Sequence, residues 1–265
     1  MSHAPLVSTL DVTGAVLLTL WAVVMWLAVG VLAFAGRGTT VRPWLRPLAI
    51  GLLALGVVGQ AGHLQEHVAQ AGYWIAHPNA PSWMTPWGDG LARGMGQVDP
   101  SKATLGMEIL HLVGNLIFLA GLVGVALVTR DATRHPTSRK WAKMGVWMQG
   151  IHGLEHLSLT LSVAFGAQRA IGLSTWFGTL EPGAGLTTYR VWWHFVANVV
   201  GSVIFGLALY HLWREHRSAA AVPDGGGGAA GREAEREPAP LGTEVCTCGR
   251  SESPDGSPVL AGPAT

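Results

Sequence analysis

The sequence predicts an all-α integral membrane protein with five transmembrane helices, of which the last four form a pseudo-two-fold bundle made of two repeated hairpins. Three observations support this fold class. Of the 265 residues, 49% are hydrophobic and only 12% are charged. Five apolar segments are each long enough for a transmembrane helix, which needs about 20 residues. A polar pattern recurs in the second and fourth of these segments, which indicates an internal duplication.

The five predicted spans are 10–34, 45–69, 104–128, 141–165 and 189–213. Backbone groups in lipid must be satisfied internally and no strand-like alternation competes, so each span is predicted as a helix. No Lys or Arg precedes the first span, which favours a retained helix over a cleaved signal peptide. We therefore expect a transmembrane domain over 1–217 and a disordered cytoplasmic tail over the Gly-, Pro- and Glu-rich residues 218–265.

Basic residues predict how the chain is oriented in the cell membrane. Cytoplasmic loops carry an excess of Lys and Arg. Between spans one and two, between three and four, and after span five lie Arg37, Arg42, Arg46, Arg130, Arg134, Arg139, Lys140, Lys143, Arg214 and Arg217. The opposite loops carry only Arg93, Lys102, Arg169 and Arg190. The N-terminus is therefore predicted outside and the C-terminus in the cytoplasm. The outer loops, 71–103 and 167–188, are rich in Trp and are expected either to form a structured cap or to anchor the interface.

Two polar patterns recur along the spans. Q-x-x-H-x-x-E-H occurs at 60–67 and 149–156, and H-x-x-x-N occurs at 111–115 and 194–198. Hairpins 45–128 and 141–213 are therefore interpreted as copies of one unit. Spans two and four point the same way, so the copies are expected to be related by a pseudo-two-fold axis along the membrane normal.

Helical spacing places the polar residues of each span on one face, because side chains at i, i+3, i+4 and i+7 lie close together. Their depths also agree, so the histidines are expected to meet in the outer half of the membrane. The candidate metal ligands are His63, His67, His111, His152, His156 and His194, and the candidate catalytic carboxylates are Glu66, Glu108 and Glu155.

Ionisable groups inside spans are costly and usually mark a site, and imidazole ligates zinc, copper and iron. Three histidines per repeat predict two metal ions. His63, His67 and His111 would hold the first ion, and the repeat assigns the second to His152, His156 and His194. The carboxylates would bridge the ions or orient the imidazoles.

Known metal sites show similar arrangements. Three histidines per ion resemble the two halves of type 3 copper sites. Glu66, Glu155 and E-x-x-H at 108–111 are similar to the ferritin-like di-iron pattern, although Val191 stands where the second E-x-x-H needs its Glu. The site also resembles that of the di-iron membrane desaturases and hydroxylases, whose H-x-x-H-H boxes are absent here. These resemblances imply two transition-metal ions, with iron favoured over copper or zinc.

The predicted function is a metal-dependent membrane oxidoreductase that uses dioxygen to oxidise or hydroxylate an apolar, membrane-partitioned small molecule. Its expected partners are the lipid bilayer, this substrate and an electron donor, and the net charge of +1 excludes a basic nucleic-acid binder.

Several alternatives stay open. A haem b electron-transfer protein could use facing pairs such as His63 and His152 as axial ligands, and a metal-binding or transport protein is a third class. The string H-x-x-E-H also coincides with a metalloprotease motif. In the tail, Cys246 and Cys248 form a C-x-C that can bind soft metals.

Overall fold

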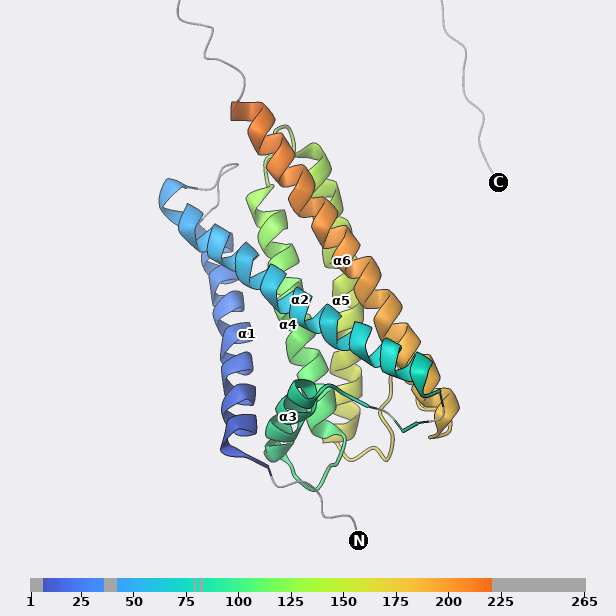
Figure 1. The fold of residues 1–265 in the computed structure, drawn as a ribbon. Helices are drawn as coiled ribbons and strands as arrows, with labels where there is room; N and C mark the ends of the chain where they lie inside the picture. Colours follow the sequence, from blue (N-terminus) through green and yellow to red (C-terminus); the bar gives the residue numbers. More distant parts are fainter. Residues whose placement is uncertain (1–6, 36–41, 79, 82, 221–265) are drawn as a thin grey trace, which may run out of the picture. The chain divides into compact units, whose positions relative to one another are not determined.

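The computed structural model describes residues 7–35, 42–78, 80–81 and 83–220, and within these ranges every regular element is a helix (Figure 1). The predicted all-α class is thereby confirmed. The long helices are α1 (Thr9–Ala35), α2 (Arg46–Ala76), α4 (Leu105–Val128), α5 (Pro136–Ala164) and α6 (Ala184–Ala220). A short helix, α3 (Pro86–Met95), lies between α2 and α4, and single 3-10 turns cover Pro43–Leu45, Gly96–Val98 and Leu173–Thr175.

Four of the described helices are long and apolar enough to cross a membrane, which marks the chain as a membrane protein. They are Thr9–Ala35, Pro43–Ala76, Leu105–Val128 and Ala184–Ser218. The predicted fourth span coincides with α5, which has 29 residues but is less apolar than these four. Three basic residues in its first turns and the polar residues of the repeat lower its hydropathy. The structure thus supports four of the five predicted spans by length and composition.

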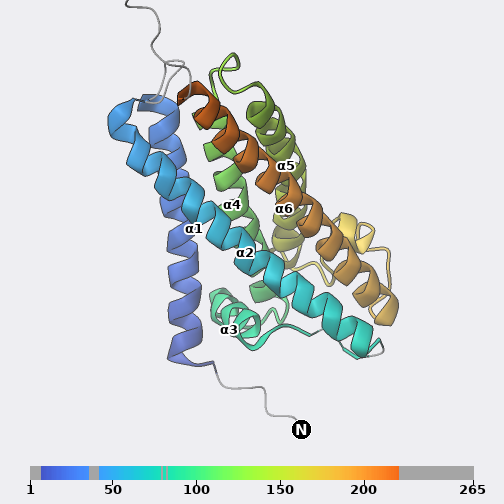
Figure 2. The same cartoon turned by 45° about the horizontal axis from the view of Figure 1, so that its top comes forward.

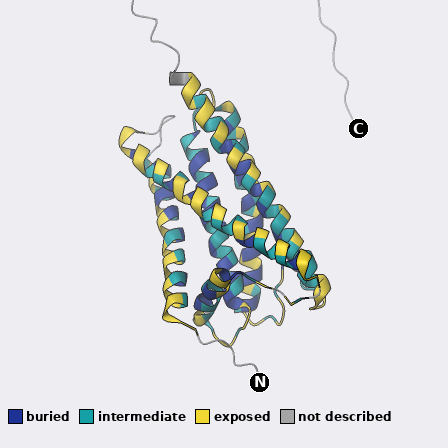
Figure 3. Ribbon diagram, viewed as in Figure 1, coloured by how far each residue is buried: buried dark blue, intermediate teal, exposed yellow. Residues whose placement is uncertain are grey.

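Helix α4 lies at the centre of the helical domain (Figure 3). It packs against α1, α2, α3 and α5, while α6 packs against α2 and α5. Phe118 and Leu122 of α4 meet Ala142 of α5 and Phe205 of α6 in one buried apolar cluster. The rings of Phe118 and Phe205 are 5.5 Å apart in an edge-to-face arrangement, which aromatic pairs favour. This cluster joins the last three helices on the side away from the polar repeat.

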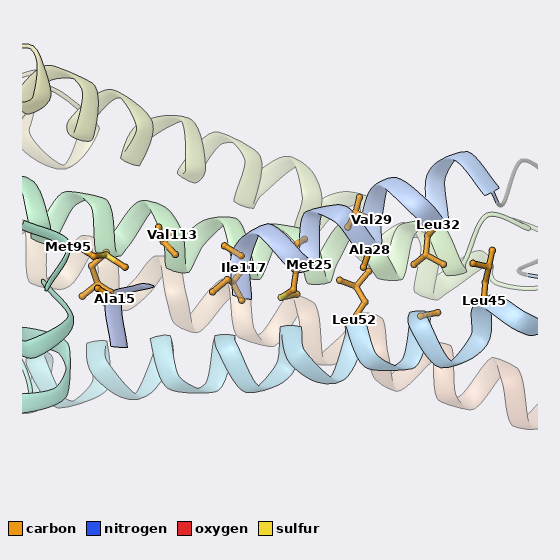
Figure 4. Packing of buried hydrophobic residues seen from close by; sticks show 14 residues of the cluster. Ala15, Met25, Ala28, Val29, Leu32, Leu45, Leu52, Met95, Val113 and Ile117 are labelled. Atoms are coloured by element: carbon orange, nitrogen blue, oxygen red, sulfur yellow. The ribbon is translucent and has the colours of Figure 1, made fainter. Parts of the chain in front are cut away.

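Helix α1 packs mainly on α3 and α4, through a second apolar cluster that includes Ala15, Met25, Met95, Val113 and Ile117 (Figure 4). From the ends joined by 36–45, α1 and α2 diverge along their length, and α3 lies beside α1 at the far end (Figures 1 and 2). Among the described residues, the first helix is therefore held mainly by the first hairpin, and Arg130 beyond it donates to the carbonyl oxygen of Leu32 at 2.7 Å.

Helices α2 and α4 approach closely where two glycines meet. A Cβ atom on Gly56 would lie 2.9 Å from the Cα atom of Gly121, and one on Gly121 would lie 3.1 Å from that of Gly56. Small residues allow such backbone contact between membrane helices. The crossing brings the second half of α2 and the first half of α4 close together.

The helices differ from the predicted spans mainly at their ends. Helix α2 continues to Ala76, α5 begins at Pro136, and α6 continues to Ala220, beyond the predicted domain end at 217. The hydropathy windows mark only the apolar part of each helix, whereas hydrogen bonding continues through the polar ends. The predicted disordered tail otherwise lies at 221–265, outside the described residues, together with Cys246 and Cys248.

Candidate metal centre

The six predicted histidines lie together in the helical bundle. Those of α2 and α5 lie in the second half of each helix, and those of α4 and α6 lie in the first half. Since the connections α2–α4 and α5–α6 are at the same end, these positions share one level. His67 and His156 are almost completely buried, with 1% and 0% of their surfaces exposed.

In the first hairpin, the imidazoles of His63 and His67 lie one turn apart on α2 with ring centroids 4.8 Å apart. The ring of His111 on α4 is 6.2 Å from His63 and 5.6 Å from His67. Two nitrogens that share one metal ion lie roughly 3 Å apart, since each is about 2 Å from the metal. The Nε2 atoms of His63 and His67 are 2.9 Å apart, which agrees with this spacing.

The second hairpin contains an equivalent group. The rings of His152 and His156 on α5 are 4.7 Å apart. The ring of His194 on α6 is 5.9 Å from His152 and 5.1 Å from His156. These three distances follow the order of the three in the first hairpin.

The two groups also touch each other. Stacked rings join them on both sides: His67 lies 5.5 Å from His194, and His111 lies 5.4 Å from His156. The rings of His111 and His194 are 5.5 Å apart. The structure therefore forms a single cluster from all six predicted histidines, which we call the histidine cluster.

Hydrogen bonds at Nδ1 fix the tautomer of several of these rings. Nδ1 of His111 is 2.8 Å from the carbonyl oxygen of Met107, and Nδ1 of His194 is 2.7 Å from that of Arg190. A carbonyl oxygen only accepts, so Nδ1 carries the proton. In the neutral ring Nε2 then keeps its lone pair for another partner.

Four ring nitrogens in the cluster are buried and without a partner: Nε2 of His152, both nitrogens of His156, and Nε2 of His194. Buried polar atoms are normally paired, and an unpaired one calls for an explanation. Metal-binding histidines characteristically donate Nδ1–H to an oxygen and leave Nε2 for the ion. As they stand, no three His, Cys, Asp or Glu side chains of the described residues are arranged to hold a metal ion. The donor set nevertheless fits such ions.

Glu66 does not face the histidine cluster directly. Its Oε1 atom accepts hydrogen bonds from the backbone N–H of Thr85 at 2.9 Å and from the side-chain amide of Gln70 at 3.1 Å, and its Oε2 atom accepts from the Thr85 hydroxyl. Gln70 in turn accepts from Nδ1 of His67 at 3.0 Å. Thr85 caps helix α3, so the carboxylate connects this helix to the imidazole of His67.

Glu155 has the same place in the second hairpin. Its Oε1 atom accepts from the backbone N–H of Ser174 at 2.7 Å, and its Oε2 atom accepts from the indole N–H of Trp193 at 3.1 Å. The Nδ1 atom of His152 is 3.6 Å from Oε2. Both carboxylates are therefore placed to orient imidazoles and to hold the loop that follows their helix.

Glu108 is completely buried and forms an ion pair with Arg190 of α6, at 2.9 Å between Nη2 and Oε1. Its other oxygen has no partner. Arg190 precedes Val191, the position where the di-iron pattern would need a second Glu. In this chain the pair of carboxylates expected from that pattern is replaced by a carboxylate and a cation.

Side-chain amides about one turn from the cluster histidines, on the side of the Phe118 cluster, join the two hairpins. Gln60 of α2 donates to Asn198 of α6 at 3.3 Å, and Gln149 of α5 donates to Asn115 of α4. Each Asn donates to the carbonyl oxygen of the cluster histidine one turn before it. These hydrogen bonds fix the positions of α4 and α6 along their axes relative to α5 and α2.

Two cavities reach the histidine cluster. The larger, of about 830 Å³, is lined by the charged residues Asp89, Arg93, Lys102 and Arg190 among mostly apolar ones, and includes His111 and His194. The smaller, of about 260 Å³, lies between α1, α2 and α4 and is lined by His63, His67 and His111 together with mostly apolar residues. Both polar and apolar molecules therefore have a path to the cluster.

The sequence analysis did not identify Gln70 on α2, Thr85 and Ser174 in the connecting segments, or Arg190 and Trp193 on α6 as partners. Thr85 followed by Pro86 was a usable signal, because Thr before Pro at the first helical position is typical of a helix start. Both loop partners also stand 19 residues after the Glu that they contact, which the duplication could have revealed. Of the other histidines, His3 lies outside the described residues, and His77, His135, His211 and His216 lie away from the cluster, in connections or toward helix ends.

Neither the curated proteins nor the solved structures contain a match to this chain. Residues 1–241 match the model of a family of unknown function, DUF6008. The match covers all the described helices and all the histidines of the cluster. The chain therefore belongs to the DUF6008 family.

Proposed function

We propose that the histidine cluster binds two transition-metal ions and that the protein is a membrane oxidoreductase acting on an apolar small molecule. The observation that carries the proposal is the cluster itself: six imidazoles packed together in one bundle, four of them buried, with ring nitrogens of His152, His156 and His194 that lack partners. Six uncharged imidazoles packed together for structure alone would leave these nitrogens unsatisfied at a considerable cost.

The distances support two equivalent metal positions. Exchanging the hairpins maps His63, His67 and His111 onto His152, His156 and His194. The matched ring separations are then 4.8 and 4.7 Å, 6.2 and 5.9 Å, and 5.6 and 5.1 Å. The contacts of Glu66 and Glu155 with loops 19 residues later match as well. We take the two hairpins as pseudo-two-fold copies, each holding one ion.

A fifth transmembrane span belongs to the proposal, because the surface of α5 is suited to lipid. Its exposed apolar side chains, at the spacing of one helix face, are Met144, Trp147, Ile151, Leu154, Leu157 and Leu161. Its polar residues of the repeat are buried, Gln149 at 2% exposure and His156 at 0%. A helix that is apolar outside and polar inside can cross the bilayer within a bundle. With five spans and the basic loops in the cytoplasm, the N-terminus is outside.

The surroundings of the carboxylates bear on the choice of metal. The sequence pattern favours iron because Glu66, Glu108 and Glu155 resemble the bridging ligands of di-iron sites. Their oxygens instead contact Thr85, Ser174, Trp193 and Arg190. Imidazole alone suits copper as well as iron, and three imidazoles per ion resemble the halves of type 3 copper sites. Copper is therefore our first choice and iron the second.

The reaction that fits this arrangement removes hydrogen from a two-electron donor. Two donor molecules each lose two electrons and two protons, and one dioxygen takes up all four of each to give two waters. When bound, the metal ions would supply the one-electron steps that dioxygen requires. The chain's own residues hold the imidazoles in one tautomer through Met107, Arg190 and Gln70. The larger cavity, which charged residues line in part, would give water and protons a path to His111 and His194.

Metal analysis of the purified, copper- or iron-loaded protein tests the proposal. We expect about two ions per chain, and about one in each of the variants His63→Ala and His152→Ala. His77→Ala, which changes an exposed histidine beyond the end of α2, is the matched control and should keep both ions. Full metal content in both cluster variants would leave the histidines as structural hydrogen-bond partners. A Soret band that is lost in those variants would instead identify a haem protein. Selective binding of zinc would exclude the proposed oxidoreductase function.

A further inference from the structure

The smaller cavity has a polar side and an apolar side. Helix α1 supplies Leu18 and Trp21, α3 supplies Leu91, and α4 supplies Leu110 and Ile117. The opposite side is formed by the imidazoles of the first hairpin. A molecule in this cavity would be surrounded by hydrocarbon and would still contact ring nitrogens of the histidine cluster.

The entrance of this cavity is on the apolar surface of the bundle. Val58 and Trp87 line it and are also exposed, at 59% and 44% of their surfaces. Val58 lies on α2 and Trp87 on α3. In a membrane this surface faces lipid, so the cavity is open to molecules dissolved in the bilayer.

One unpaired donor lies in this apolar wall. Nε1 of Trp21 is buried and has no hydrogen-bond partner. The ring edge that carries this atom faces α2, since a Cβ atom on Gly59 would lie 3.6 Å from Cζ2 of Trp21. The neighbouring Trp26 on the same helix donates to the carbonyl oxygen of Leu116 at 3.1 Å. A buried indole N–H normally finds an acceptor. Trp21 lines the cavity, so an oxygen of a bound molecule that displaces the atoms covering Nε1 would complete this donor.

Two glycines leave room beside the imidazoles. A Cβ atom on Gly62 would meet no atom within 4 Å, and one on Gly114 would lie 2.7 Å from Nδ1 of His63. Gly62 therefore borders open space, and Gly114 lets the ring of His63 lie flat against α4. The cavity volume of about 260 Å³ lies just below the roughly 300–1,000 Å³ of typical ligand sites. It suits one substituted ring better than a whole lipid.

We infer that this cavity binds a lipid-soluble quinol, with one ring oxygen accepting a hydrogen bond from Trp21 and the ring lying against His63, His67 and His111. An alkyl tail would leave between α1 and α2 into the bilayer. Binding needs only the cavity, whereas turnover rests on the proposed function. In that reaction the quinol is the two-electron donor: both O–H bonds break, the quinone leaves, and two quinols reduce one dioxygen to two waters.

Photolabelling with an azido-benzoquinone that carries a decyl chain tests the site in the reconstituted full-length protein. Mass spectrometry should find the label on peptides of α1, α2 and α4 that line the cavity. Gly62→Leu should abolish this labelling because leucine fills the space beside His63. Gly51→Leu is the matched control, since a Cβ there also meets nothing within 4 Å and Gly51 does not line the cavity. Unchanged labelling in Gly62→Leu would overturn the inference.

A second pair of variants tests the hydrogen bond. Trp21→Phe should weaken competition by unlabelled decylbenzoquinone roughly 2- to 10-fold, as expected for the loss of one net hydrogen bond. Trp26→Phe should leave this affinity unchanged. An alkyl azide without the quinone ring should label only the lipid-facing surface. Equal labelling of the cavity by this alkyl probe, or equal affinity in Trp21→Phe, would contradict a quinol site.

Metal content separates this inference from the proposed function. If the protein holds no metal but the quinone labels the cavity in a Gly62-dependent way, the binding site stands and the oxidase is wrong. If two ions are bound but labelling is diffuse, the metal centre stands and the quinol site is wrong.

Discussion

At the scale of single residues, hydrogen bonds decide which nitrogen of each imidazole is available. His111 and His194 donate Nδ1–H to carbonyl oxygens one turn earlier, and His67 is held through Gln70. A helix supplies such a carbonyl at every turn, so a histidine can be oriented without any special partner. The carboxylates add orientation only for the histidines of α2 and α5.

Glu155→Gln should weaken metal binding. The amide has one acceptor oxygen where the carboxylate has two, so either Ser174 or the side shared by Trp193 and Nδ1 of His152 loses its acceptor, and the charge beside His152 is lost in both cases. Loss of an orienting partner typically reduces metal affinity about 10- to 100-fold. Competition with a chelator of known affinity measures the change.

Glu181→Gln is the control for this prediction, because Glu181 is exposed and pairs only with Arg169 in the described structure. It should bind metal as the unmodified chain does. Equal affinities in the two variants would show that Glu155 holds the loop without orienting His152.

At the scale of helices, the crossing of α2 and α4 sets the geometry of the first hairpin. Gly56 and Gly121 bring the two backbones into contact, and about two to three turns further along α2 the side chains of His63 and His67 meet His111 of α4. A wider separation at the glycines would therefore be transmitted to the cluster.

Gly56→Ala should destabilise the folded bundle by about 1–3 kcal/mol, the usual cost of overpacking. Its Cβ atom would meet backbone, which cannot turn aside. Gly51→Ala on the same helix has open space and should be neutral or stabilising by up to about 1 kcal/mol, because Ala favours helix. Unfolding in mixed micelles of increasing sodium dodecyl sulfate measures both, and equal stability of the two variants would contradict the close packing.

Helices were the most predictable part of the fold. Long apolar runs announced α1, α2, α4 and α6, because lipid imposes length and composition directly. Helix α3 was missed because it has only 10 residues and few apolar ones. Its stability comes from Glu66 and from close contact with α1 and α4, where Gly94 lies against Asp11 and Gly106 against Ala92. Because these contacts are between distant parts of the chain, the only local sign of α3 in the sequence is its start at Thr85–Pro86.

At the scale of the whole molecule, the orientation and the status of α5 are tested together. Alkaline phosphatase, which is active only when exported, can be fused after Gly90, Thr133, Glu181 or Arg217. With five spans and an outer N-terminus, fusions after Gly90 and Glu181 should be active, and those after Thr133 and Arg217 inactive. Equal activity after Thr133 and Glu181 would mean that α5 does not cross the membrane.

The residues of the histidine cluster were predictable from the sequence, but the partners of the three carboxylates were not. Spacing alone placed all six histidines at one level, since helix geometry fixes face and depth. The partners of Glu66 and Glu155 come from connecting segments, whose course no periodicity reveals. The ion pair joins Glu108 and Arg190, two residues that are 82 positions apart in the sequence. A single sequence carries no sign of such a pair.

Both connecting segments, α2–α4 and α5–α6, are attached to carboxylates of α2 and α5, and this attachment couples the histidine cluster to the surface of the protein. Thr85 begins α3, and Ser174 lies in the short turn Leu173–Thr175, so each connection is tied to a carboxylate that also adjoins an imidazole or its amide partner. Whatever tightens the imidazoles also tightens these two segments. A protease applied from their side would then cut the protein more slowly when the cluster is occupied, and cleavage rate would serve as a gauge of occupancy that requires neither colour nor turnover.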